Sequence, residues 1–177
     1  MSSVTRSLKQ LETNNGMITS LSRPERKVRQ KDREIKDRKV IDDIIKRCRV
    51  CHLAMCDNGQ PYVVPLNFGY DGRFLYFHAA PEGRKIDIIK INNRVGFEFD
   101  ILHKIVKAEQ ACKWGAKYES VIGSGTVEIV DNLDAKKEAL EWIMRQYGSD
   151  IRIFSDEVME KTLVFRVLII EISGKKR

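Results

Sequence analysis

The stretch PYVVPLNFGYDGRFLYFHAA, residues 61–80, decides more about the fold than any other part of the chain. Apolar residues recur through both of its halves, and Asp71-Gly72 between them is typical of a tight turn. Upstream, Asn58-Gly59 is a strong hairpin signal, because both residues of such a turn need positive φ. The two turns predict a meander of three antiparallel strands at residues 50–56, 61–70 and 73–79.

Periodicity outside this meander predicts three more strands and three helices. The last strand is almost continuously apolar, which favours a closed sheet, since a strand covered on both faces cannot leave an open edge. Residues 101–117 are expected to be irregular. We therefore expect a mainly β fold with helices (α+β), in which six mostly antiparallel strands form a small barrel. The further strands are expected at residues 95–100, 118–130 and 163–172, and the helices at residues 32–47, 84–92 and 134–147.

The length of 177 residues suits one domain. With 42% hydrophobic and 32% charged residues, the composition excludes disordered, collagen-like and membrane-spanning classes. The net charge of +7 equals the surplus of the first 49 residues, which hold 14 Lys/Arg against 7 Asp/Glu. We treat residues 1–30 as a basic N-terminal arm and residues 31–177 as the folded domain.

The basic arm raises the question of an anionic partner. It carries no helix-turn-helix, finger or RRM pattern, and solvated charges explain its composition equally well. We therefore expect neither nucleic-acid binding nor membrane binding. The sequence also shows no secretory signal and no run of about 20 apolar residues, which predicts a cytoplasmic location.

The four cysteines include a C-x-x-C-H motif that runs from Cys48 to His52. Covalent haem attachment of that kind takes place after export, for which this sequence has no signal. A zinc site made of Cys48, Cys51, His52 and Cys56 is disfavoured, because neighbouring residues on a strand point to opposite faces. We expect buried structural thiols, no disulfide and no metal ion.

Arg84 and Lys85 follow Gly83 at the predicted start of a helix. Two cations there oppose the helix dipole, whereas a phosphate would accept hydrogen bonds from the first-turn N–H groups and ion pairs from both side chains. A pair of solvated surface cations is the alternative and explains the composition equally well.

Pro65 interrupts a predicted strand two residues before Asn67. A proline removes one ladder donor, so backbone groups near Pro65 are expected to be left for a polar ligand, with Asn67 offering a donor and an acceptor. An edge-strand proline without a ligand explains the same residues.

Three segments together resemble the FMN-binding split-barrel proteins related to pyridoxamine 5'-phosphate oxidase. They are residues 63–68, the text LYFHAAPEGRK at residues 75–85, and residues 88–99. The closer resemblance is to the nitroimidazole-resistance branch, through GQPYVVPLNFGY at residues 59–70 and YESVIGSG at residues 118–125. The resemblance covers about residues 30–175.

This resemblance implies a six-stranded antiparallel split β-barrel and a homodimer whose subunits together build each flavin site. It places Arg84 and Lys85 at the FMN phosphate and His78 on the strand beside the flavin. A half-buried histidine bonded to a neighbour is the alternative for His78, and a core or surface tryptophan is the alternative for Trp114, a candidate to close over the flavin from the partner subunit. The remaining positions implied at the flavin are Val64, Pro65, Leu66, Asn67 and Ser120.

The function implied is that of an FMN-dependent oxidoreductase with a small-molecule substrate, nitro compounds among the candidates, and with His78 as the one candidate catalytic residue. Vitamin B6 oxidation is not expected, because the C-terminal substrate-binding segment of the oxidase has no counterpart here. A flavin- or haem-binding protein for sensing or storage is a second hypothesis. A split barrel that uses the deazaflavin F420, or no cofactor, is a third.

Overall fold

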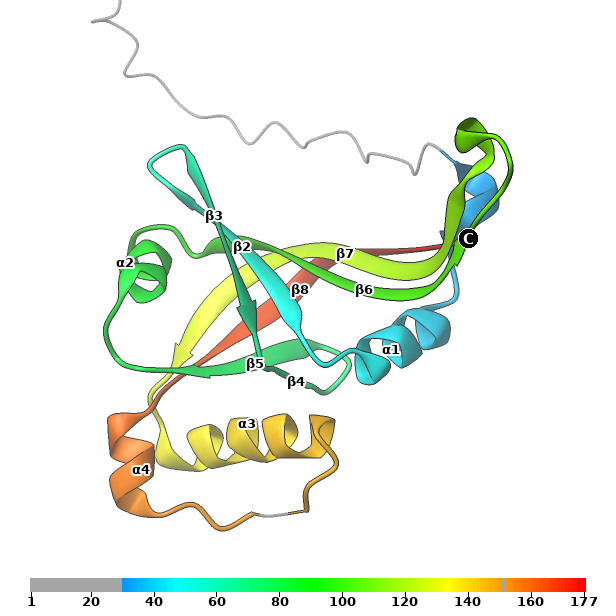
Figure 1. The fold of residues 1–177 in the computed structure, drawn as a ribbon. Coiled ribbons are helices and arrows are strands. Elements are labelled where there is room, and N and C mark those ends of the chain that lie inside the picture. Colours follow the sequence, from blue (N-terminus) through cyan, green and yellow to red (C-terminus); the bar gives the residue numbers. More distant parts are fainter. Residues whose placement is uncertain (1–29, 151) are drawn as a thin grey trace, which may run out of the picture.

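The computed structural model describes residues 30–150 and 152–177, so the predicted basic arm, except Gln30, lies outside the described residues. A single sheet, with every pairing antiparallel, carries helices at both ends and on one face (Figure 1). The strands are β1 Glu34–Ile35, β2 Cys51–Asp57, β3 Gln60–Leu66, β4 Gly69–Tyr70, β5 Phe74–Ala79, β6 Arg94–Val106, β7 Gly115–Val130 and β8 Leu163–Lys176. The α-helices are α1 Arg38–Arg47, α2 Arg84–Ile91, α3 Leu133–Gln146 and α4 Asp156–Lys161.

Within the described residues the sheet has eight strands, in the order β3-β2-β6-β7-β8-β5-β4, with β1 paired to β8. The predicted α+β class is confirmed, but the count of six strands and the closed sheet are wrong, because the observed path is open. The two extra strands have physical causes. β1 is too short to show periodicity, and the expected strand at residues 61–70 divides into β3 and β4 at Asn67-Phe68, where Phe68 turns into the core and is fully buried.

The predicted meander is therefore correct only in part. The turn at Asn58-Gly59 joins the paired strands β2 and β3, and the turn at Asp71-Gly72 joins β4 and β5. However, β3 and β5 lie near opposite ends of the strand order and are not neighbours. Local turn signals fix each hairpin but not the partner of the strand between them.

The main core lies between the inner face of the sheet and the first two helices. Alternate residues of β2, β5 and β6 point into it, together with three isoleucines from each of α1 and α2. The partly buried residues Tyr62, Val64 and Leu66 of β3 pack against the same core. Strands from both ends of the open strand order therefore pack around one core, which gives the sheet the shape of a barrel.

The first helix begins later than the sequence predicts. α1 starts at Arg38, where the Asp37 side chain accepts a hydrogen bond from the Lys39 N–H as N-cap. Ile35 belongs instead to β1 and pairs with Gly174. The apolar spacing that includes Ile35 extended the predicted helix past its real capping residue.

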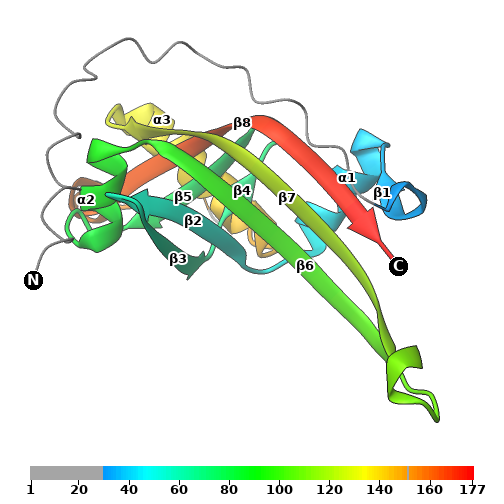
Figure 2. The ribbon, with the colours of Figure 1, turned by 90° about the horizontal axis from the view of Figure 1, so that it is seen from above.

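The prediction of an irregular segment at residues 101–117 is correct only for the connection at residues 107–114, which contains one short 3-10 helix, Ala111–Lys113. On either side of it β6 and β7 continue as a paired ribbon, with a register shift between Leu102 and Lys104, and form a long arm that projects from the sheet (Figure 2). Most of its side chains are exposed on both faces, so no alternation of apolar and polar residues marks the pairing.

A second core lies on the other face of the sheet, under α3 and α4 (Figure 1). It contains Tyr76, Leu140, Ile143 and Val164. α3 falls within one residue of its predicted bounds and ends at Gln146. Gly148, two residues later, has φ +79° and donates its N–H to the Arg145 carbonyl, as expected for the predicted C-terminal capping glycine. In the described part of the chain, no helix combines the length and the apolarity needed to cross a membrane.

Candidate functional site

The start of α2 presents the two cations predicted to bind a phosphate. α2 begins at Arg84, directly after Gly83, which has φ +120°, a conformation that favours glycine. Within the described residues no side chain caps this end of the helix. Its first-turn N–H groups and the positive end of its dipole therefore favour an anion.

Arg84 already has a partner in the chain. Its guanidinium Nη2 lies 3.2 Å from Oδ2 of Asp57, and its Cζ lies 4.6 Å from the centroid of the Tyr62 ring. Asp57 and Tyr62 belong to β2 and β3, so the hairpin holds Arg84 beside the helix start. An anionic ligand must compete with Asp57 for this guanidinium.

The residues at the β3 edge divide between its two faces. Val64 and Leu66 are half-buried against the main core, whereas Pro65 and Asn67 are exposed on the outer side. β3 is an edge strand, and its pairing with β2 continues through Pro65 to Leu66. The expected interruption at Pro65 is therefore absent, because an edge strand tolerates a proline whose missing N–H faces away from the neighbouring strand.

Asn67 lies where the ladder does end. Its Nδ2 donates to Oη of Tyr147 over 2.9 Å, and the N–H of Phe68 donates to the same hydroxyl over 3.2 Å. The Tyr147 hydroxyl donates in turn to the Arg49 carbonyl over 2.7 Å. This link to α3 fixes the break between β3 and β4.

His78 lies on β5, on the same strand face as Phe74 and Tyr76, and its side chain is exposed. The opposite face of β5 carries the fully buried Leu75 and Phe77. Within the described ranges no hydrogen bond or ion pair engages the His78 ring. The alternative of a half-buried histidine bonded to a neighbour is therefore not what the structure shows, and both ring nitrogens are available to a ligand.

Trp114 and Ser120 lie away from the start of α2. Trp114 sits at the tip of the β6–β7 arm, 48% exposed, with Nε1 donating to the Ala108 carbonyl over 2.7 Å. Figures 1 and 2 both place this tip and α2 at opposite ends of the molecule. Ser120 is half-buried on β7, between Asp100 and Lys175 in the register. One subunit therefore does not bring all the predicted residues together.

The C-x-x-C-H motif does not form a ligand set. Cys48 and Cys51 are buried, whereas His52 points to the other face of β2 and Cys56 is exposed. Burial raises the pKa of the Cys48 thiol to about 11, and burial likewise raises the pKa of Cys51, so both stay protonated at neutral pH. All four cysteines are free thiols, and the buried pair fits the predicted structural role.

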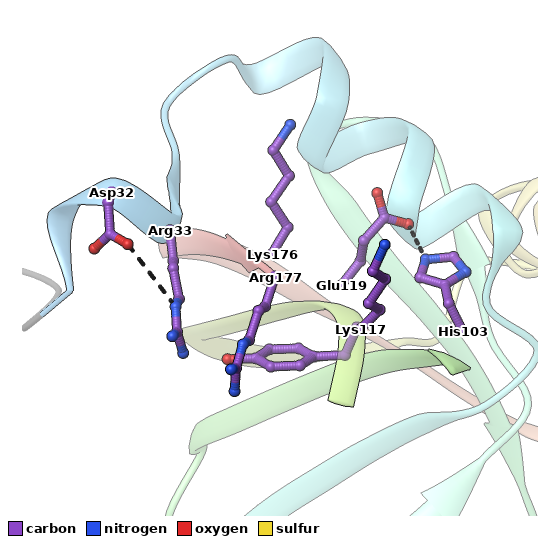
Figure 3. A pocket seen from close by; sticks show the side chains of 8 residues that line it. Asp32, Arg33, His103, Lys117, Glu119, Lys176 and Arg177 are labelled. Atoms are coloured by element: carbon purple, nitrogen blue, oxygen red, sulfur yellow. Dashed lines mark hydrogen bonds and ion pairs between the residues drawn. The ribbon is translucent and has the colours of Figure 1, made fainter. Parts of the chain in front are cut away.

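A hollow of about 580 Å³ at the base of the arm was not predicted from the sequence (Figure 3). Glu119 lies in it, within 2.7 Å of Arg47 Nη2 and 3.0 Å of His103 Nε2. Burial raises the pKa of Glu119, but the hydrogen bonds from Arg47 and His103 outweigh it and hold that pKa below its usual value. In the sequence, the basic residues Lys176 and Arg177 at the C-terminal end were the signal that could have pointed to this hollow. The hollow is lined by Asp32, Arg33, His103, Lys117, Tyr118, Glu119, Lys176 and Arg177.

Comparisons with known proteins place this fold in a family. Residues 37–176 match the family model described as pyridoxamine 5'-phosphate oxidase. An uncharacterized protein of Rhizobium meliloti (strain 1021) is 37% identical over 49 residues, a match that spans 28% of this chain and only 32% of that protein.

Two solved structures are similar over most of the chain. A proposed 5-nitroimidazole antibiotic resistance protein from Bacteroides thetaiotaomicron VPI-5482 is 37% identical, with a TM-score of 0.73 over 80% of this chain and 85% of that one. The flavocytochrome Anf3 of Azotobacter vinelandii is 22% identical, with a TM-score of 0.74 over 85% of this chain and 72% of that one, and it shows the shared fold alone. On the family match and the Bacteroides structure, this chain belongs to the pyridoxamine 5'-phosphate oxidase-like family.

Proposed function

We propose that this protein binds FMN and reduces small molecules of the nitro-compound class, in the cytoplasm and as a homodimer. The observation that carries the proposal is the 37% identity, over 80% of the chain, with the proposed 5-nitroimidazole antibiotic resistance protein. The flavin is supported by family membership and by neighbours of the same fold that are named as flavocytochrome or FAD-binding proteins.

The residues at the start of α2 fit the phosphate of FMN. No described side chain caps this helix end, a Cβ at Gly83 would meet no other atom within 4 Å, and Arg84 and Lys85 add two positive charges. One cation pair at one helix end suits a single terminal phosphate, which favours FMN over the longer FAD. At the β3 edge, the exposed Pro65 and Asn67 are the residues that offer a rim to the ring system without disturbing the core.

FMN supplies electron or hydride transfer when bound, so the protein has to orient the cofactor and handle protons. His78 suits proton delivery, because it is exposed and no neighbour in the described chain occupies its ring nitrogens. Arg84 and Lys85 have a different role, since their positive charges suit charge-assisted hydrogen bonds to the phosphate.

Replacing His78 by Ala is expected to leave the fold and most of the FMN affinity intact while lowering turnover. The side chain supports neither core, and a positioned acid contributes about 10²- to 10⁴-fold to a rate. Steady-state kinetics with saturating FMN test this, with the melting temperature and FMN affinity as controls. Turnover equal to that of the wild type would remove His78 from the mechanism.

A homodimer is expected because one subunit leaves two surfaces uncovered. The outer face of β3, β7 and β8 exposes Val63, Ile122 and Ile170 by 57, 58 and 62%, and the arm holds Trp114 far from the helix that would bind the phosphate. A partner that packs over this face shields the apolar residues and can bring its own arm to the site.

Light scattering is expected to give about twice the chain mass of 20.5 kDa at micromolar concentration. Val63→Glu/Ile122→Glu should shift the protein toward monomer, because each glutamate would lose water at the interface. Val158→Glu, on the exposed surface of α4, is the matched control and should leave the mass unchanged. A wild-type mass of 20.5 kDa with flavin bound would rule out the dimer.

The activity itself is tested by turnover with a reduced nicotinamide donor and a panel of nitro compounds. Flavin-dependent oxidation of the donor that requires a nitro compound supports the proposal. Stable flavin binding without turnover on any of them would favour the alternative of a flavin- or haem-binding protein with a sensing or storage role.

A further inference from the structure

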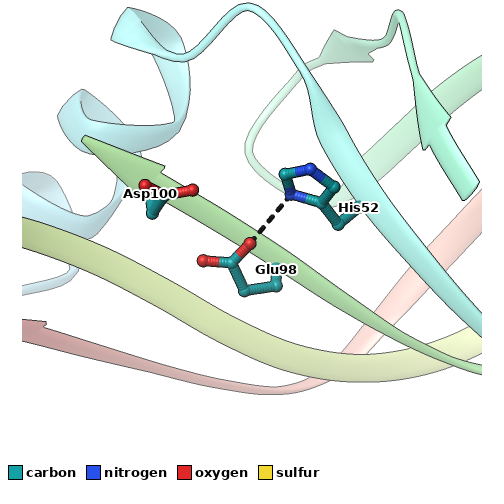
Figure 4. Close-up of side chains that lie close together, drawn as sticks. All are labelled: His52, Glu98 and Asp100. Carbon is teal, nitrogen blue, oxygen red and sulfur yellow. Dashed lines mark hydrogen bonds and ion pairs between the residues drawn. The ribbon is translucent and has the colours of Figure 1, made fainter. Parts of the chain in front are cut away.

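A second cluster of ionisable side chains lies on the outer face of the sheet, away from the helix start. His52 of β2 pairs directly with Glu98 of β6 in the register, and Asp100 follows two residues later on the same face. Nδ1 of His52 lies 3.0 Å from Oε2 of Glu98, and one potential ligand atom from each of the three residues lies within 4.8 Å of the others (Figure 4). The sheet register alone brings them together.

In the described part of the chain, no lysine or arginine pairs with the carboxylates of this cluster, Glu98 and Asp100. Burial raises the pKa of Glu98, hydrogen bonding to His52 opposes this, and the negative charge of Asp100 raises it further. Among the described residues, the hydrogen bond from His52 is thus the one side-chain contact that the Glu98 carboxylate has.

A second histidine–glutamate pair in the same chain provides a direct comparison. His103 Nε2 also lies 3.0 Å from a glutamate oxygen, on Glu119, but Arg47 donates to that same carboxylate over 2.7 Å. Arg47 therefore already supplies the positive charge there. Within residues 30–150 and 152–177, no arginine pairs with Glu98 in the same way.

We propose that His52, Glu98 and Asp100 bind one divalent transition-metal ion, with Zn²⁺ as the probe. An imidazole nitrogen and two carboxylate oxygens are ligands that Zn²⁺ accepts in proteins, and three protein ligands leave a fourth position for water. Two ligand atoms that are each about 2.1 Å from one zinc ion lie about 3.0 to 3.4 Å apart, so the His52–Glu98 spacing already suits a shared ion. Of the cysteine and histidine residues considered in the sequence, only His52 takes part.

The three ligands come from one chain, so the site does not depend on flavin binding. It does lie on the face proposed for the subunit interface, since Ile122 is the next residue across the sheet from Glu98. A metal ion would neutralise carboxylates that are costly to cover without a partner charge. The site is therefore tested in both the dimeric protein and the Val63→Glu single variant, because a glutamate at position 122 would add a carboxylate beside Glu98.

The experiment is a calorimetric titration of EDTA-treated, full-length protein with Zn²⁺. Because Cys56 and Cys112 are exposed free thiols, all variants carry Cys56→Ser/Cys112→Ser. One Zn²⁺ per chain is expected. Glu98→Gln and His52→Gln should each weaken binding by at least about 10- to 100-fold, a loss that even outer-shell partners produce.

His103→Gln is the matched control and should leave the affinity unchanged, because Glu119 is already paired with Arg47. The absorption spectrum of bound Co²⁺ gives a second readout and should disappear in Glu98→Gln but persist in His103→Gln. Absence of Zn²⁺ binding at micromolar concentration would overturn the proposal, as would binding that survives both Glu98→Gln and His52→Gln. Flavin content measured in the same preparations separates this outcome from a failure of the FMN proposal.

Discussion

Protein that carries Arg84→Glu/Lys85→Glu is expected to purify without colour and to bind FMN at least about 100-fold more weakly than the wild type. Each cation at the start of α2 contributes a charge-assisted hydrogen bond to the phosphate of about 1.5 to 3 kcal/mol, so removing either one should weaken binding by about 10- to 100-fold. Replacing both with glutamate also places two negative charges beside the phosphate. Fluorescence titration with FMN measures the loss.

The structure supplies a control of opposite sign. Asp57→Asn removes the carboxylate that lies 3.2 Å from Arg84 and leaves the guanidinium to the ligand, so FMN affinity should rise. From the sequence alone, a surface-only Arg84–Lys85 pair predicts that the double glutamate variant melts at a higher temperature, because the helix dipole favours acidic residues. The ion pair with Asp57 weakens that expectation, since a glutamate in place of Arg84 would face the Asp57 carboxylate. FMN affinity, and not melting temperature, is therefore the decisive measurement. Wild-type FMN affinity in the double variant would defeat the phosphate assignment.

Phe99→Ala is expected to lower the free energy of unfolding by about 3 to 5 kcal/mol, the range for a large aromatic side chain removed from a core. Phe99 is fully buried on β6, with ring centroids 4.8 Å from Phe68 and 6.0 Å from Phe97. Its loss opens a cavity between the sheet and the residue at which β3 passes into β4. Urea denaturation followed by circular dichroism measures the change.

Leu102→Ala is the matched control for this cavity. Leu102 lies three residues further along the same strand and is 58% exposed, so its truncation should change the stability by about 0.5 kcal/mol or less. A cost below about 1 kcal/mol for Phe99→Ala would show that the three aromatic rings do not form the tightly packed core described here.

Sequence signals that act over a few residues predicted the fold well. The Asn58-Gly59 and Asp71-Gly72 turns, the start of α2 at Arg84 and the Gly148 cap all lie where expected, because each depends on local backbone geometry. The α+β class follows from the same signals.

Features that depend on contacts distant in sequence were missed. The arm is held by pairing between β6 and β7, with no burial pattern to mark it in the sequence. The pairings of β2 with β6 and of β5 with β8 join strands that no turn signal connects. The two-residue strand β1 exists only because β8 lies beside it.

In the candidate site, too, features formed by adjacent residues could be predicted, whereas contacts between distant segments could not. Gly83, Arg84 and Lys85 are adjacent in sequence, so their helix start could be recognised there. The contact of Arg84 with Asp57, the use of the Asn67 amide by Tyr147 and the pairing of His52 with Glu98 each join segments at least 27 residues apart. Only the sheet register and helix packing reveal them.

The visible spectrum of freshly purified protein is the most direct test of whether the chain is a flavoprotein that holds FMN. We expect a yellow protein with the absorption of oxidised flavin, from which heat releases FMN in an amount of about one per chain. A colourless protein that fails to bind added FMN at micromolar concentration would contradict it, as would a preparation whose only chromophore is haem or F420.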